Sequence, residues 1–311
     1  MEHQRQSEVT LGLVLPPYDE PARLWDAARI AEQRGFHSVW ATDSTLPGFP
    51  WLDGLSVLGG LAAVTHTVQL GTSIFVPARR NPVLLAHTLT TLDHLSGGRL
   101  NFGVGVGEEG LRPQEYAIAG VSMAQRGAIT DEYLDLFHRL WTEPAVTHEG
   151  RFFQCHEITV EPKPVRQGKI PIWIGGKAEG SLRRAAAVGD AWLPALLTVE
   201  DYRLLRTRLE EYLDAASRDQ ASITSGLYTF AAIGRTREDA RAVLAPAIEA
   251  IFHAPFEHFE SLCLFGTPND WLEQIGRFAE AGVRHVNVLL YTRDLLGDVH
   301  MIGQEVVPRL S

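Results

Sequence analysis

Several features that would mark a particular class of protein are scarce in this sequence. Only two cysteines occur, Cys155 and Cys263, far apart and without the spacing of a metal site. We therefore expect two reduced, partly buried thiols and no bound metal. No stretch approaches the roughly 20 apolar residues needed to cross a membrane. The polar segment Met1 to Thr10 also lacks the apolar run of a signal peptide. These absences predict a cytoplasmic protein without a membrane partner.

Positive charge is scarce as well. The chain has 28 Lys and Arg against 38 Asp and Glu, a formal net charge of −10. Nonspecific binding to nucleic acid needs a basic face, so we expect no nucleic-acid partner. A local basic pocket for a small anionic ligand remains compatible with this charge.

The sequence also lacks linkers rich in glycine, proline or serine, short repeats and low-complexity tracts. Its 311 residues, 45% of them hydrophobic, are enough for one large α/β domain. We predict a single domain spanning residues 1–311.

Short apolar runs alternate with helical patterns along the chain. Thr198, Thr236 and Thr267 each precede an Asp by three residues, which is typical of a helix N-cap. Alternating strands and helices indicate a parallel sheet, and eight strands at this length predict a closed (β/α)8 TIM barrel with insertions. A doubly wound open sheet is the alternative. The predicted strands are Val9 to Leu15, His37 to Thr42, Val68 to Val76, Leu100 to Val106, Pro171 to Ile174, Asp190 to Pro194, Leu227 to Ile233 and Val283 to Leu290.

Two segments interrupt this alternation. Residues 108–123 are predicted to be irregular, and residues 146–164 to form an extended excursion from the barrel.

Active sites of such barrels lie at the carboxyl ends of the strands, and this rule selects the candidate residues. They are Asp43 and Ser44 after the second strand; Thr72, Ser73 and Ile74 in the third; Gly105, Gly107 and Glu108 at the fourth; and Gly175, Gly176, Lys177, Gly180 and Ser181 after the fifth.

Glycines alternate along the fourth strand, at Gly103, Gly105 and Gly107. Gly105, Gly107 and Gly110 match G-x-G-x-x-G, but Arg112 and a proline follow where a dinucleotide site needs a helix. We expect the alternating glycines to let a flat ligand approach, with close packing of the protein itself as the alternative.

The segment Gly175 to Ser181 follows a strand and enters a helix. Free amides at a helix N-terminus bind phosphate, and Lys177 or Ser181 could add contacts. A tight turn with a capped helix is the equal alternative from the residues alone.

Other residues favour a structural interpretation. Arg79 and Arg80 are expected to be a solvated pair, with contact to an anionic substrate or cofactor tail as the alternative. His253 and His258 are expected on the surface. Glu108 and Glu109 could supply a general acid, although a surface pair of carboxylates is the simpler interpretation.

The tryptophans Trp40, Trp51 and Trp173 are expected mainly in the core, with the lining of a pocket as the alternative.

Several runs taken together resemble the bacterial-luciferase-like superfamily, which includes flavin monooxygenases and coenzyme F420-dependent oxidoreductases. The resemblance covers nearly the whole chain. It is carried by Gly35 to Trp40 leading to Asp43, Leu70 to Ile74 leading to Asn81 and Pro82, Leu95 to Leu100, Gly103 to Gly107, Pro171 to Gly176, and Gly266 to Pro268.

The resemblance implies a (β/α)8 barrel with a deazaflavin or flavin ring over its mouth. It also implies a cis peptide at Ser73–Ile74 behind the ring, and the cofactor phosphate at the turn from Gly175 to Ser181. Homodimers are expected from the resemblance, and so is a reductase partner that supplies reduced F420 or FMN. The substrate is expected among Trp51, the segment after Glu108 and the insertion from Phe252 to Phe259.

Glu108 matches an acid of the sugar-phosphate dehydrogenases in the deazaflavin branch, and Asp43 matches their aspartate after the second strand. Those relatives carry a histidine next to this aspartate, where the present chain has Ser44. Serine alone is not a base, so the departure argues against alcohol dehydrogenation.

We therefore expect an oxidoreductase that uses reduced F420 for hydride transfer to or from a small organic substrate, with Glu108 as proton donor. An FMNH2-dependent monooxygenase using O2 is the first alternative, and a non-catalytic flavin-binding protein the second. A non-redox barrel enzyme is a further rival.

Overall fold

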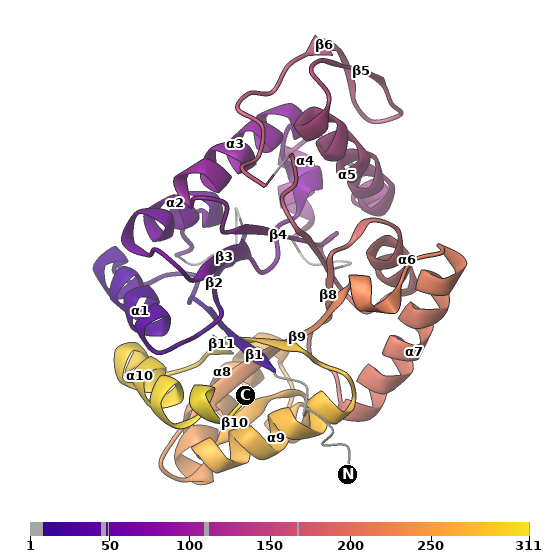
Figure 1. Ribbon diagram of the computed structural model, residues 1–311. Coiled ribbons are helices and arrows are strands. Elements are labelled where there is room, and N and C mark those ends of the chain that lie inside the picture. The colour runs from indigo at the N-terminus through magenta and orange to yellow at the C-terminus, as the bar shows by residue number, and fades with distance from the viewer. Residues whose placement is uncertain (1–8, 45–47, 49, 109–111, 167, 311) are drawn as a thin grey trace, which may run out of the picture.

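Parallel strands of this protein close into a barrel (Figure 1). The computed structural model describes residues 9–44, 48, 50–108, 112–166 and 168–310. The sheet runs β10-β9-β11-β1-β2-β3-β4-β7-β8, and pairing of β8 with β9 closes it. This closure confirms the predicted TIM barrel and excludes the open sheet. The barrel strands are β1 (Thr10–Val14), β2 (Ser38–Ala41), β3 (Gln69–Thr72), β4 (Leu100–Val104), β7 (Ile172–Gly175), β8 (Ala191–Leu193), β9 (Thr224–Ile233) and β11 (His285–Leu290).

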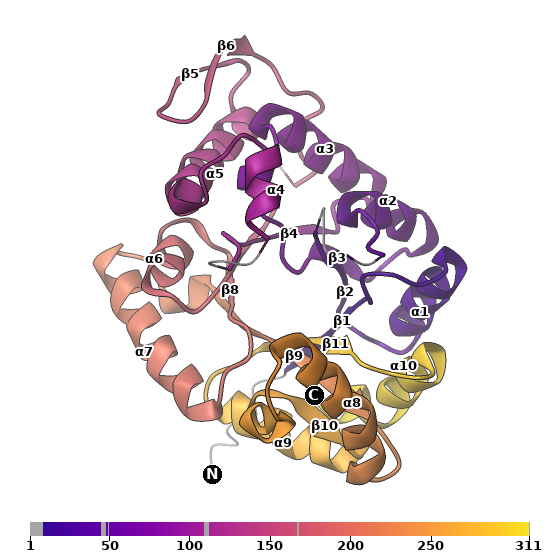
Figure 2. The same ribbon diagram turned by 180° about the vertical axis from the view of Figure 1, so that it is seen from behind.

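Helices surround the barrel, as both end-on views show (Figures 1 and 2). Thr198, Thr236 and Thr267 cap α7, α8 and α9 as predicted. The α-helices are α1 (Pro21–Gln33), α2 (Gly54–Val64), α3 (Pro82–Leu95), α4 (Pro113–Ile118), α5 (Arg126–Thr142), α6 (Glu179–Val188), α7 (Val199–Ala215), α8 (Arg237–Phe252), α9 (Pro268–Glu280) and α10 (Leu295–Glu305). Short 3-10 helices are η1 (Pro77–Arg79), η2 (Met123–Gln125), η3 (Gln220–Ser222), η4 (Phe256–His258), η5 (Glu260–Leu262) and η6 (Val307–Arg309).

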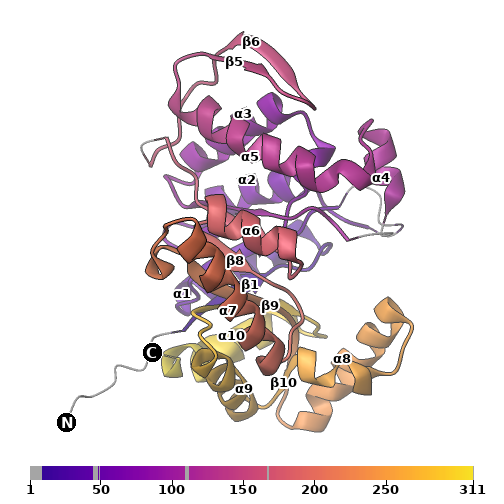
Figure 3. The ribbon, with the colours of Figure 1, turned by 90° about the vertical axis from the view of Figure 1, so that its right-hand side faces the viewer.

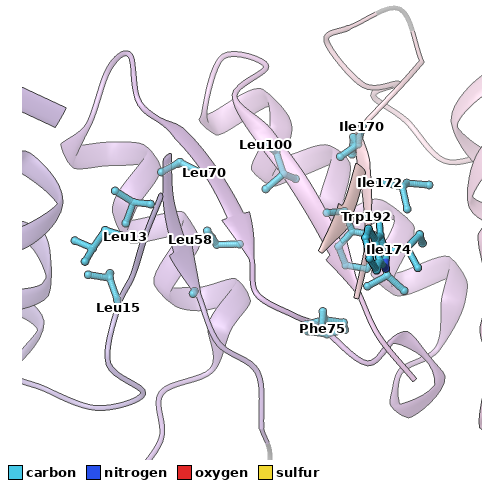
Figure 4. Close-up of a cluster of buried hydrophobic side chains, with 14 of the residues drawn as sticks. Leu13, Leu15, Leu58, Leu70, Phe75, Leu100, Ile170, Ile172, Ile174 and Trp192 are labelled. Carbon is cyan, nitrogen blue, oxygen red and sulfur yellow. The ribbon is translucent and has the colours of Figure 1, made fainter. Parts of the chain in front are cut away.

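The main core lies between the strands and the helices. Side chains alternate along a strand, and the outward ones here are aliphatic or aromatic, as the buried cluster in Figure 4 illustrates. Leu13, Leu70, Leu100 and Ile174 belong to this outer core.

The barrel interior is filled by different residues. Trp40 is fully buried there and lies edge-on to Trp173, with ring centroids 5.0 Å apart. A Cβ on Gly71 would lie 2.4 Å from the Trp40 ring, and one on Gly12 would lie 2.7 Å from its Nε1. The glycines therefore make room for the indole. Trp40 and Trp173 are core residues, as predicted.

A polar layer underlies this indole. His285 is completely buried, and its Nε2 lies 2.8 Å from Asn287 Oδ1, while its Nδ1 lies 2.7 Å from Thr10 Oγ1. Burial lowers the pKa of His285 to about 3, so the imidazole is neutral. Both ring nitrogens of His285 therefore have hydrogen-bond partners, and the ring carries no charge inside the barrel.

Two segments differ from the expectations drawn from sequence, and a third agrees with them. Within the stretch predicted to be irregular, residues 113–118 form α4 and residues 123–125 form η2. β10 (Leu264–Gly266) was not predicted and pairs with the end of β9. The predicted excursion contains an antiparallel hairpin of β5 (Val146–Glu149) and β6 (Gln154–Ile158).

The side view shows how these insertions are placed. The hairpin stands beyond α3 and α5, whereas α4 and α8 project from one end of the barrel (Figure 3). α4 follows the carboxyl end of β4, so that end is the mouth of the barrel.

The two cysteines are free thiols, as predicted. Cys263 is buried, which raises the pKa of its thiol to about 12. No helix in the described ranges is long and apolar enough to cross a membrane.

Glu32 on α1 connects its helix to the loop before β3. Its carboxylate accepts the backbone N–H groups of His66, Thr67 and Val68 at 2.6–3.0 Å. Partial burial raises the pKa of Glu32, but these hydrogen bonds outweigh it and lower the pKa from 4.5 to about 2. Ionised Glu32 therefore stabilises the fold above pH 4.5, and the stabilisation is lost as the pH falls toward 2.

We predict that Glu32→Gln lowers the free energy of unfolding by about 1–3 kcal/mol at neutral pH. Urea titrations at several pH values should show this difference shrinking through the acidic range, because protonation removes the same interaction from the wild type. Glu211→Gln, at an exposed position on α7, is the matched control. A difference that stays constant with pH would contradict the assignment.

Candidate active site at the barrel mouth

A cavity of about 790 Å³ opens at the carboxyl ends of β9, β11, β1 and β2. Trp51, from the loop after β2, lines it together with Tyr228 and Phe230 of β9 and Tyr291 after β11. Trp51 thus lines a cavity, which was the alternative to a core position, and its contact with a substrate stays a prediction. Such a concave, aromatic-lined space with few polar groups is typical of a small-molecule site.

The opposite half of the mouth is formed by the ends of β3, β4 and β7. The Ser73–Ile74 peptide is cis, as expected. The Ile74 side chain is partly exposed and packs against the interior cluster that contains Trp40 and Trp173.

Glycines of the neighbouring strands surround Ile74. A Cβ on Gly105 would lie 2.0 Å from Ile74 Cδ1, and one on Gly175 would lie 2.6 Å from the same atom. A Cβ on Gly103 would lie 1.8 Å from the carbonyl oxygen of Thr72. These glycines make room for Ile74 and for the β3 backbone, which matches the alternative of close packing by the protein itself. Approach of a flat ligand to this strand end stays a prediction.

The other candidates near Ile74 also contact the protein itself. Thr72 Oγ1 donates to the carbonyl of Gly103 at 2.8 Å, and Ser73 Oγ accepts from Asn287 Nδ2 at 3.4 Å. Gly107 has φ +74°, and a Cβ there would lie 2.1 Å from the Tyr116 hydroxyl. Thr72, Ser73 and Gly107 therefore contact other residues of the protein at the rim of the barrel.

A buried charge cluster joins three rim loops. Arg79 Nη2 lies 2.6 Å from Asp43 Oδ2, and Arg79 also forms an ion pair with Glu115. The three side chains are only 5%, 2% and 1% exposed, respectively. The expectation of a solvated Arg79 was therefore wrong. Two carboxylates that converge on one buried site need a cation between them, which a sequence pattern does not reveal.

Burial and charge act in opposite directions within this cluster. Burial raises the pKa of Asp43, against the lowering effect of the Arg79 and Arg80 guanidinium groups. Burial also lowers the pKa of Arg79, and the Asp43 carboxylate opposes this. Arg80 is more exposed and lies 3.7 Å from Asp43 and 3.4 Å from Asp53.

Ser44 connects this cluster to the cavity. Its hydroxyl donates to Glu115 Oε1 at 2.7 Å and accepts from Arg112 Nη1 at 2.9 Å. Arg112 lines the cavity, with its guanidinium 5.1 Å from the Trp51 ring centroid. Ser44 itself is buried, so it reaches the cavity only through Arg112. Neither Glu115 nor Arg112 was a candidate, because both lie at or within the helix that was predicted as irregular chain.

Glu108 follows β4 and is exposed at the rim. Within the ranges that the structure describes, it has no hydrogen-bond or ion-pair partner. It is not brought into contact with Asp43. Glu109 and Gly110 lie outside the described residues.

The turn from Gly175 to Ser181 leads into α6. Gly176 has φ +109°, and a Cβ there would lie 2.6 Å from the hydroxyl of the buried Ser181. Lys177 and Gly180 are exposed. Unlike α7, α8 and α9, α6 has no side-chain cap at its N-terminus. The side-chain cap of the capped-helix alternative is therefore absent, and within the turn the Ser181 N–H donates to the carbonyl of Ala178 at 2.8 Å.

The two candidate histidines lie away from the cavity. His253 ends α8 with φ +53°, and His258 is exposed in η4. Neither lines the mouth cavity. No cluster of three or more potential metal ligands occurs in the part of the chain that the structure describes.

Comparisons with known proteins agree with this architecture. A profile of the luciferase-like monooxygenase family matches residues 3–256. The chain is 27% identical to an F420-dependent glucose-6-phosphate dehydrogenase of Nakamurella multipartita, over 93% of each chain.

Solved structures show the same fold at low identity. The coenzyme F420-dependent tetrahydromethanopterin reductase of Methanopyrus kandleri matches with a TM-score of 0.84 and 21% identity, over 98% of this chain and 100% of that one. The FMN-bound oxygenating constituent of 3,6-diketocamphane monooxygenase from Pseudomonas putida matches with a TM-score of 0.79 and 17% identity, over 97% and 99%.

We predict that Arg79→Met lowers the free energy of unfolding by about 3–5 kcal/mol, because the two buried carboxylates of Asp43 and Glu115 then lose the guanidinium between them. Denaturant titration measures this loss. Adding Glu115→Gln should recover part of it, since one buried charge is removed. Arg277→Met, at a side chain 64% exposed on α9, should cost at most about 0.5 kcal/mol. Equal losses in both arginine variants would contradict the buried cluster.

We also predict that Gly105→Ala destabilises the protein by about 1–3 kcal/mol through its collision with Ile74. Ile74→Val removes the colliding Cδ1, so the double variant should regain part of the loss in thermal melting. Gly276→Ala on α9, where a Cβ meets nothing within 4 Å, should be neutral or stabilising. Additive effects of the two mouth substitutions would contradict the contact.

Proposed function

The chain belongs to the luciferase-like monooxygenase family, and we propose that it is an oxidoreductase that uses coenzyme F420 for hydride transfer to or from a small organic substrate. The observation that carries the proposal is the similarity, over 93% of both chains, to an F420-dependent glucose-6-phosphate dehydrogenase. Among the family's chemistries, this relationship favours the deazaflavin cofactor over FMN.

The residues at the mouth are compatible with such a cofactor. Ile74 offers a partly exposed apolar surface, and Gly105 and Gly175 add no side chains beside it. The turn before α6 has no side-chain cap, which leaves the start of this helix and the exposed Lys177 for a phosphate group. Bound F420 would supply the hydride-transfer chemistry, which the side chains of the protein lack.

We assign separate roles to the acidic residues. Glu108 is the proposed proton donor, because its carboxylate is exposed at the rim and is not held by an ion pair with any described residue. Asp43 is the proposed positioning residue for Arg79, because its carboxylate is buried against that guanidinium. Ser44 is occupied by Glu115 and Arg112, which supports the inference that it is not a base.

Further expectations remain proposals. They are a single folding domain, a cytoplasmic homodimer, no metal, and a reductase partner that supplies reduced cofactor.

The test is a set of parallel tryptophan-fluorescence titrations with F420, FMN and reduced FMN. We expect F420 to bind with a Kd below about 100 μM, and more tightly than either form of FMN. Preferential binding of reduced FMN with O2 consumption would instead support the monooxygenase alternative. Absence of binding by all three ligands would overturn the proposal.

Glu108→Gln is tested by the same titrations and by an assay of turnover. The variant should bind F420 as the wild type does, but the rate at which it reoxidises reduced F420 with a panel of C=C and C=N acceptors should be lower. Unchanged turnover would remove Glu108 from the mechanism.

A further inference from the structure

We propose that the mouth cavity binds an anionic substrate and that Arg112 and Arg293 hold its carboxylate or phosphate group. The inference rests on the proposed function, because it names the substrate class of the same site.

The cavity is separate from the part of the mouth that we assign to the cofactor. Its walls come mainly from the ends of β9, β11, β1 and β2 and from α8, and Arg112 reaches it from the segment between β4 and α4. Ile74 and the turn from Gly175 to Ser181 lie at β3 and β7, on the other half of the ring of strands. An anion bound at the two arginines therefore lies apart from the phosphate turn before α6.

The cavity carries positive charge that its own walls do not neutralise. Three arginines line it, and Asp19 is the one acidic residue among its described lining residues. Asp19 pairs with Arg23 at 3.4 Å. Within the described ranges, the Arg112 guanidinium donates only to the Ser44 hydroxyl, and the Arg293 side chain has neither a hydrogen bond nor an ion pair. In a chain of net charge −10, two such cations at one cavity indicate an anionic ligand.

Arg112 is held in place before any ligand arrives. Its guanidinium lies over the Trp51 ring at 5.1 Å and donates to Ser44, which is itself bound to the buried Glu115. A guanidinium fixed in this way presents its remaining N–H groups in the planar geometry that carboxylates and phosphates match. Ser44 thus orients an arginine for binding, at the position where relatives carry a histidine.

The remaining walls suit an apolar, planar substrate body. Tyr228, Phe230 and Tyr291 form an aromatic surface in the cavity. Burial raises the pKa of Tyr291 to about 12 and that of Tyr228 still higher, so both phenols are neutral hydrogen-bond donors. The pocket therefore combines a cationic end with an aromatic wall.

The test uses the full chain and three small probes: 3-phenylpropionate, phenyl phosphate and the neutral 3-phenylpropionamide. Saturation-transfer NMR titrations should show that at least one anion binds about ten-fold more tightly than the amide. Arg112→Gln and Arg293→Gln should each weaken the anion about ten-fold and leave the amide unchanged, whereas Arg112→Lys should lose less. Arg277→Gln, an exposed arginine on α9, is the matched control and should change nothing.

The outcomes separate the sources of the anion. Binding of phenyl phosphate alone supports a phosphorylated substrate, and binding of 3-phenylpropionate alone supports a carboxylic acid. Equal affinities for the amide and the anions, or unchanged anion affinity in both glutamine variants, would overturn the proposal. If Arg112→Gln does not fold, the anion affinity of Arg293→Gln, a variant at an exposed position, decides the result.

F420 titrations of the same variants separate this proposal from the proposed function. Unchanged F420 affinity with lost anion affinity supports a substrate site. Lost F420 affinity with unchanged probe affinity would assign the arginines to the cofactor and overturn the inference. If the wild type binds the anions but not F420, the proposed function fails and the anion site stands.

Discussion

Arg79 between two buried carboxylates is the interaction on which the rim of this barrel depends. A single buried charge is costly, so Asp43, Arg79 and Glu115 must occupy the same site for any of them to be tolerated. These residues come from the loop after β2, from η1 and from α4. Their ion pairs therefore fix three successive rim segments relative to one another, and Ser44 and Arg112 are positioned by the same contacts.

The barrel mouth is divided into two halves with different chemistry. On one half, glycines at the ends of β4 and β7 allow Ile74 to face outward, beside a turn with uncapped amides. On the other half, aromatic side chains surround a cavity of about 790 Å³ that Arg112 and Arg293 also line, neither of them in an ion pair with a described residue. The proposed function uses this division, with the cofactor over Ile74 and the substrate against the aromatic wall. Hydride transfer requires two ligands in contact, which a mouth with two different halves can provide.

Ser44 illustrates how a departure from a family pattern can be understood once its contacts are known. From the sequence, the serine only argued against a base. In the structure, its hydroxyl lies between Glu115 and Arg112, and its contacts suggest a role in binding rather than in proton transfer. The distinction depends on α4, since both partners lie at or within that short helix.

The eight barrel strands and their order followed from sequence alone, because the alternation of apolar runs and helical patterns is a local property. The N-caps Thr198, Thr236 and Thr267 followed for the same reason. The resemblance placed the cis peptide at Ser73–Ile74 correctly. The tertiary structure decided what the rim residues touch: Arg79 is buried, and Gly105 makes room for Ile74. Such contacts join residues from different loops, and the free energy of burying a charge or filling a void depends on all neighbours at once.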